Sequence, residues 1–117
     1  MKNYIIDWVK REVTFEGDTV TFEVLPLKRG VVMPLIEKFG QFDGDDQVKM
    51  TGQISDIMEF MRPHFDTNLR DIQGIKINGE EPTVDDLIDY TDFTLLINDI
   101  ITNMINVSSL DKSEVQD

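Results

Sequence analysis

Apolar and polar residues alternate along two short segments near the start of the chain. Residues 12–15 and 20–24 have the period of two that is typical of strands with one covered face. The apolar positions are Val13, Phe15, Val20, Phe22 and Val24. Residues 16–18, Glu-Gly-Asp, are turn formers. We therefore predict an N-terminal hairpin whose apolar face is covered by helices, because two strands alone are marginally stable.

A helical period follows over residues 31–39. The apolar residues are spaced i, i+3, i+4, i+7, at Val32, Leu35, Ile36 and Phe39. This spacing puts Pro34 in the first turn, where a missing N–H costs least, and makes Gly40 a natural stop.

A second helix is expected over residues 46–61, with Pro63 ending it. Its apolar positions are Met50, Ile54, Ile57, Met58 and Met61. The acidic loop before it, residues 41–46, is predicted to be a solvated turn that caps this helix. Its glycine and acids do not match a calcium-binding loop, because that motif requires Gly at position six and Glu at position twelve.

The C-terminal third begins with an extended segment over residues 69–77 and a turn at Asn78-Gly79. Thr83 is placed to cap a short helix that runs to about Tyr90. The last helix, residues 92–107, has nine apolar residues in sixteen, which is more than one face. It is therefore either central to the fold or shared with another chain.

These elements predict a single α+β domain over residues 1–110, with an N-terminal β-hairpin packed against about four α-helices. Residues 111–117 are expected to form a polar tail.

The net charge of −12 is the compositional outlier. Residues 1–60 carry seven Lys/Arg against eleven Asp/Glu, and residues 61–117 carry four against twelve. Without a basic stripe, binding to nucleic acid is disfavoured. The acidic residues either keep the protein soluble through self-repulsion or bind a partner that has a basic surface.

The chain has no cysteine, signal-peptide pattern or membrane-length apolar run, so a soluble, cytoplasmic protein is expected. No phosphate-binding, metalloprotease or nucleophile motif is present. His64, the one histidine, has no second histidine or paired serine nearby. We expect a protein that is not an enzyme and uses no cofactor or metal.

Four patterns resemble the tail assembly chaperones of long-tailed bacteriophages. They are a T-F-x-G turn at residues 14–17, a P-L-K-R-G segment at 26–30, a run at 72–87 that ends in P-T-V-D-D-L and approximates the family's P-x-T-x-D-D-L, and an F-x-x-L-x-x-x-I helix with a serine-containing end at 93–109. The last two segments carry most of the resemblance.

The resemblance implies a chaperone that binds the tape-measure protein and keeps it soluble during tail assembly. It also implies self-association, possible recruitment of the tail-tube protein, a place in the cytoplasm of the bacterial host, and absence from the mature virion. Apolar helix residues are then candidate contacts, and core packing is the alternative use for all of them. These candidates are Met58, Met61, Phe65, Leu96, Ile100 and Met104.

Two other functions are compatible with the sequence. One is an acidic DNA mimic that inhibits a nucleic-acid-binding protein, which would need carboxylates arrayed on one face. The other is a structural tail-completion or adaptor subunit, which would stay in the finished particle.

Overall fold

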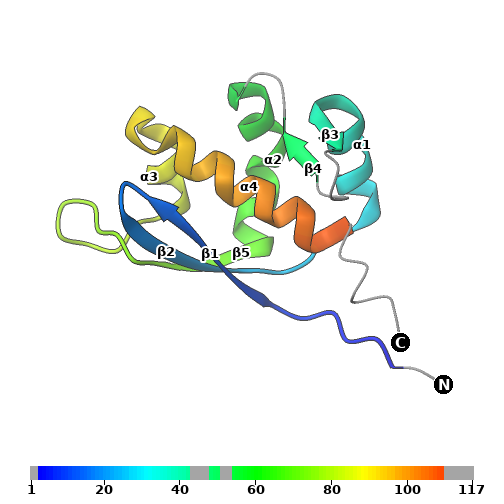
Figure 1. Ribbon diagram of the computed structural model, residues 1–117, viewed down its shortest axis with the longest axis horizontal. Coiled ribbons are helices and arrows are strands. Elements are labelled where there is room, and N and C mark those ends of the chain that lie inside the picture. Colours follow the sequence, from blue (N-terminus) through cyan, green and yellow to red (C-terminus); the bar gives the residue numbers. More distant parts are fainter. Residues whose placement is uncertain (1–2, 43–47, 51–53, 110–117) are drawn as a thin grey trace.

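The computed structural model describes residues 3–42, 48–50 and 54–109. Within these residues the elements follow the order β1, β2, α1, β3, β4, α2, β5, α3, a 3-10 turn η1, and α4. A sheet of order β1-β2-β5 lies on one side of the molecule, and helix α4 crosses its inner face (Figure 1). The predicted α+β class, with an N-terminal hairpin packed on helices, is confirmed.

The hairpin consists of β1 (Val9–Phe15) and β2 (Asp18–Val24), with Val13 opposite Val20. Its two-residue turn, Glu16-Gly17, has positive φ at both positions, at 51° and 86°. This conformation matches the twist of paired strands and favours glycine. The predicted apolar face is confirmed, and it also includes Arg11, which pairs with Phe22.

Strand β5 (Leu69–Gln73) adds to β2 in antiparallel orientation and forms the other edge of this sheet. Beyond it, Ile77 and Glu80 form an isolated bridge around the Asn78-Gly79 turn, where φ is 53° and 81°. The extended segment and turn expected here are confirmed.

Helix α1 (Arg29–Phe39) begins two residues earlier than predicted. Pro34 therefore lies in its second turn and not in the first. A small ribbon of β3 (Gly40–Phe42) and β4 (Val48–Met50) follows, where the sequence pattern had predicted a loop and the start of a helix. Most of the predicted capping loop lies outside the described residues.

Helix α2 (Ile54–Asn68) corrects two predictions. It starts eight residues after the predicted Asp46 and continues through Pro63, which is exposed. Ile57, Met61 and Phe65 share one buried stripe at four-residue spacing. This burial continues past the proline, whose ring faces water, and outweighs the lost helix hydrogen bond. The helix ends where Leu25 N–H donates to the Asn68 carbonyl at 3.0 Å.

Helix α3 (Val84–Asp89) starts as predicted, since Asp86 N–H donates to Thr83 Oγ1 at 3.2 Å. After η1 (Thr91–Phe93), α4 (Thr94–Ser109) forms the centre of the fold. Its residues on several faces are fully buried, and it packs against β1, β4, α1, α2 and α3. The described part of the chain therefore covers most of the apolar surface of this helix, with Leu95 left exposed.

Candidate interaction sites

The predicted contact residues lie mainly inside the molecule. Five of the six are at most 2% exposed, namely Met61, Phe65, Leu96, Ile100 and Met104. Met58 is half-buried and packs against the same core. In this conformation the six residues do not form a surface for a partner, so a contact role for the five buried ones would require the core to open. Their predicted role in partner binding stays a prediction.

Apolar surface is found instead at positions that the sequence reading did not select. The large hydrophobic side chains that are exposed among the described residues are Tyr4, Ile5, Ile6, Met33, Tyr90 and Leu95. Three of these are consecutive and precede β1. We call residues 3–7 the arm.

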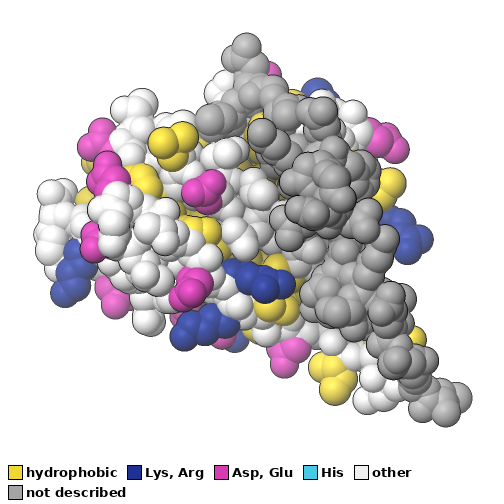
Figure 2. All heavy atoms as spheres, viewed as in Figure 1, with side chains coloured by type: hydrophobic (Ala, Val, Ile, Leu, Met, Phe, Trp, Pro, Cys, Tyr) yellow, Lys and Arg dark blue, Asp and Glu magenta, His cyan; other side chains and the backbone are white. Residues whose placement is uncertain are grey.

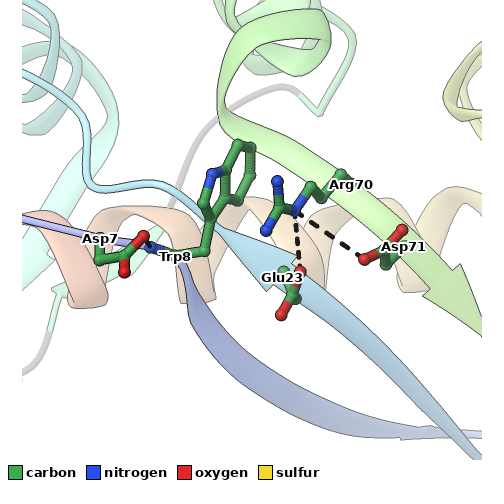
Figure 3. Close-up of polar contacts among 5 residues, drawn as sticks. All are labelled: Asp7, Trp8, Glu23, Arg70 and Asp71. Carbon is green, nitrogen blue, oxygen red and sulfur yellow. Dashed lines mark hydrogen bonds and ion pairs between the residues drawn. The ribbon is translucent and has the colours of Figure 1, made fainter.

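The arm is extended and points away from the body of the molecule (Figure 1). Its base is fixed by Trp8, whose ring stacks over the Arg70 guanidinium at 3.9 Å from Cζ to the ring centroid (Figure 3). A contact of this kind contributes about 0.5–1 kcal/mol when partly exposed. The backbone N–H of Trp8 also donates to Asp7 Oδ1 at 2.8 Å. The contact with Arg70 gives the arm a defined starting point on the outer face of the sheet.

Arg70 is held in turn by two carboxylates. Its Nε donates to Glu23 Oε1 at 2.8 Å and lies 3.9 Å from Asp71 Oδ2. The hydrogen bond from Arg70 holds the pKa of Glu23 below its ordinary value. Glu23 faces Arg70 across the β2–β5 pair, so the cluster joins the arm, the middle strand and the edge strand. The irregular register in β5, where Asp71 has a φ of 57°, lies beside it.

A groove of about 570 Å³ lies at the opposite end of the sheet. Its floor consists of the half-buried side chains Phe15, Ile75 and Phe93, and the Phe15 and Phe93 ring centroids are 6.0 Å apart. Its rim is made of the exposed residues Glu16, Asp18, Gln73, Lys76 and Glu81. The groove therefore combines an apolar floor with a rim of net charge −2.

Gly74 shapes one wall of the groove. Its φ is 109°, and a side chain there would overlap the carbonyl oxygen of Thr19 at the start of β2. The close approach brings the end of β5 against the hairpin and joins segments that are far apart in sequence. No local sequence pattern predicts this groove, because its floor is assembled from three separate segments of the chain.

Among the described residues, no cluster of three or more metal-ligating side chains occurs. His64 is partly exposed on α2. Within the same residues, no helix is both long and apolar enough to cross a bilayer.

Comparison with protein-family models, with curated proteins and with solved structures finds no match to this chain.

Proposed function

We propose that this protein is a tail assembly chaperone of a long-tailed phage or prophage, which binds the tape-measure protein and keeps it soluble without catalysing a reaction. The sequence resemblance suggests the family, and the groove is the observation that carries the proposal. Its aromatic and aliphatic floor can receive apolar side chains of a helical client, as in other helix-in-groove complexes. Its acidic rim favours a client segment that carries Lys or Arg beside those apolar residues.

The charge of the molecule supports this role. A net charge of −12 keeps a protein soluble while it carries exposed apolar groups. On the coloured part of the face in Figure 2, acidic side chains lie among Lys, Arg and uncharged residues.

In this proposal the protein acts in the cytoplasm of the bacterial host and is absent from the mature virion. A structural tail-completion subunit would instead be found in purified particles. Mass spectrometry of virions, compared with lysates of the same infected cells, separates the two functions.

The direct test is co-expression of the protein with a helical fragment of the tape-measure protein. We expect the fragment to move from the insoluble to the soluble fraction and to co-purify with the chaperone. A Gln73→Trp variant, which fills the groove from its rim, should lose this effect. Met33→Trp, which places the same bulky side chain at an exposed site on α1, is the control and should keep the fragment soluble. A fragment that stays insoluble beside the wild-type protein would refute the proposal.

A further inference from the structure

Strand β1 is an open edge of the sheet. The order β1-β2-β5 leaves one side of β1 without a neighbouring strand. The two-residue turn makes Phe15 and Asp18 a hydrogen-bonded pair, and such pairs alternate with non-bonded ones along an antiparallel ladder. The main-chain N–H and C=O groups of Lys10, Glu12 and Thr14 therefore point away from β2. Among the described residues these groups have no main-chain partner, so they form a template for an added strand.

Arg11 lies on the inner face of this edge strand. It is opposite Phe22 in the ladder and is half-buried. Within the part of the chain that the structure describes, its guanidinium makes no ion pair or hydrogen bond. A guanidinium has five N–H donors, and holding it partly out of water without an acceptor costs free energy. A carboxylate beside the edge would supply that acceptor in the bidentate geometry that arginine favours.

A polar concavity of about 450 Å³ lies beside β1. The residues that line it are Lys10, Arg11, Glu12, Thr21 and Asn103. Two cations and one carboxylate give this lining a net charge of +1, on a protein whose net charge is −12. On α4, Asn103 Nδ2 donates to the Asp99 carbonyl at 2.9 Å, which leaves Asn103 Oδ1 as an acceptor for an N–H of a ligand. The chemistry of the concavity therefore suits an acidic side chain on an added strand.

The arm prolongs the same edge. It is extended, leads directly into β1 and continues away from the body of the molecule in Figure 1. Its side chains Tyr4, Ile5 and Ile6 are 61%, 77% and 71% exposed. A strand that pairs with β1 and passes Trp8 therefore meets large apolar side chains. Consecutive exposed residues of this size are typical of an interaction site.

We propose that β1 and the arm together bind an extended segment of another protein, which adds to the sheet as an antiparallel strand. The segment carries Asp or Glu opposite Arg11 and, later in its sequence, apolar residues that cover the arm. An inward-pointing charge on an edge strand disfavours pairing with strands that lack a complementary charge, so Arg11 makes the edge selective. This site shares no lining residue with the groove, and the proposal does not rest on the chaperone function.

The test uses the full chain and a fluorescently labelled peptide of alternating Thr and Val, with one Glu near its amino end and Ile near its carboxyl end. The control peptide has Gln in place of the Glu. Fluorescence anisotropy should show that the wild-type protein binds the Glu peptide at least about tenfold more tightly than the Gln peptide. Arg11→Gln should remove this preference. Arg29→Gln, the same change at an exposed position of α1, should keep it.

Amide hydrogen exchange then locates the bound peptide. Binding should slow exchange at Lys10, Glu12 and Thr14, whose N–H groups point outward, and should hardly change Val13, which is already paired with Val20. Glu12→Pro removes one outward N–H without taking a hydrogen bond from the β1–β2 ladder, so it should abolish binding while the fold is kept. Circular dichroism of each variant checks the fold, and the exchange measurement on the wild type needs no variant.

Several results would overturn the proposal. They are equal affinity of the wild type for the two peptides, no binding of the Glu peptide at concentrations up to about 1 mM, and slowed exchange at residues 73–76 of the groove in place of β1. Slow exchange at the outward amides without peptide, increasing with protein concentration, would show that a second copy occupies the edge and would also overturn it. The tape-measure fragment takes no part in this test, so the chaperone function and the strand-binding edge fail separately.

Discussion

At the residue scale, similar side chains have different roles according to what surrounds them. Met58 and Met61 are one helical turn apart and have the same chemistry, yet Met61 is fully buried and Met58 is only half-buried. The sequence pattern grouped them as one contact surface. The tertiary structure separates them, because helix α2 places Met61 inside the core and leaves Met58 at its border.

The two methionines should therefore differ in their contribution to stability. We expect Met61→Ala to lower the free energy of unfolding by about 2–5 kcal/mol, since it leaves a cavity in the core. Met58→Ala should cost about 1 kcal/mol or less. Urea titration followed by circular dichroism measures both. Equal, small losses would show that Met61 is not packed as described.

Glu23 gives the hairpin a pH-dependent contribution to stability. Its pKa is lowered in the folded state by the hydrogen bond from Arg70. A lowered pKa means that the ionised carboxylate stabilises the fold above its ordinary pKa, and that this contribution disappears as the pH falls through the lowered value. Glu23→Gln should therefore destabilise the protein at neutral pH and have no effect in strong acid.

Thermal unfolding of the wild type and the Glu23→Gln variant over a pH series measures this difference. Glu12→Gln is the control for removing one negative charge, because Glu12 is an exposed residue of the neighbouring strand β1. A constant difference between wild type and Glu23→Gln at all pH values would contradict the assigned role of Arg70.

At the element scale, local patterns predicted what an element is better than where it ends. The hairpin and the capped start of α3 depend on neighbouring residues, and both were predicted correctly. Helix α2 was misplaced because its limits depend on burial of Phe65 beyond Pro63 and on the contact between Leu25 and Asn68. These interactions join residues that are distant along the chain, so periodicity does not reveal them.

The junction between β5 and the hairpin depends on Gly74. Gly74→Ala should lower the free energy of unfolding by about 3 kcal/mol, because the new side chain meets both an unfavourable φ and the backbone of Thr19. Gly79 is the control, since its φ is 81° but its surroundings are open. Gly79→Ala should cost only about 1–2 kcal/mol, the conformational penalty alone.

Denaturant unfolding of both glycine variants tests this comparison. Equal losses would show that the close approach to Thr19 does not matter. The Gly74 variant should also bind the client fragment more weakly than the Gly79 variant when both are folded, because the wall of the groove moves.

At the scale of the whole molecule, the central helix determines which apolar surface is covered, and the acidic surface determines how stability depends on salt. Helix α4 is buried on several faces, so the described part of the chain covers most of its own most apolar segment, and Leu95 is the large apolar side chain of this helix that stays exposed. The large hydrophobic side chains that stay exposed among the described residues lie on the arm, on α1 at Met33, and on either side of η1 at Tyr90 and Leu95.

The net charge should limit stability at low ionic strength. With −12 charges on one small domain, self-repulsion destabilises the compact state, and salt screens it. We expect the midpoint of thermal unfolding to rise by several degrees between low salt and physiological salt. A midpoint that falls with salt would mean that ion pairs such as Arg70–Glu23 dominate.

The sequence by itself determined the α+β class, the hairpin and its covered face, the helix cap at Thr83, and the need to cover the last helix. Each follows from short-range periodicity or from capping groups within a few residues. Only the tertiary structure decided which apolar residues are core, where α2 lies, and that Phe15, Ile75 and Phe93 meet in one groove. The physical reason is that burial depends on neighbours brought from distant parts of the chain, which no local pattern specifies.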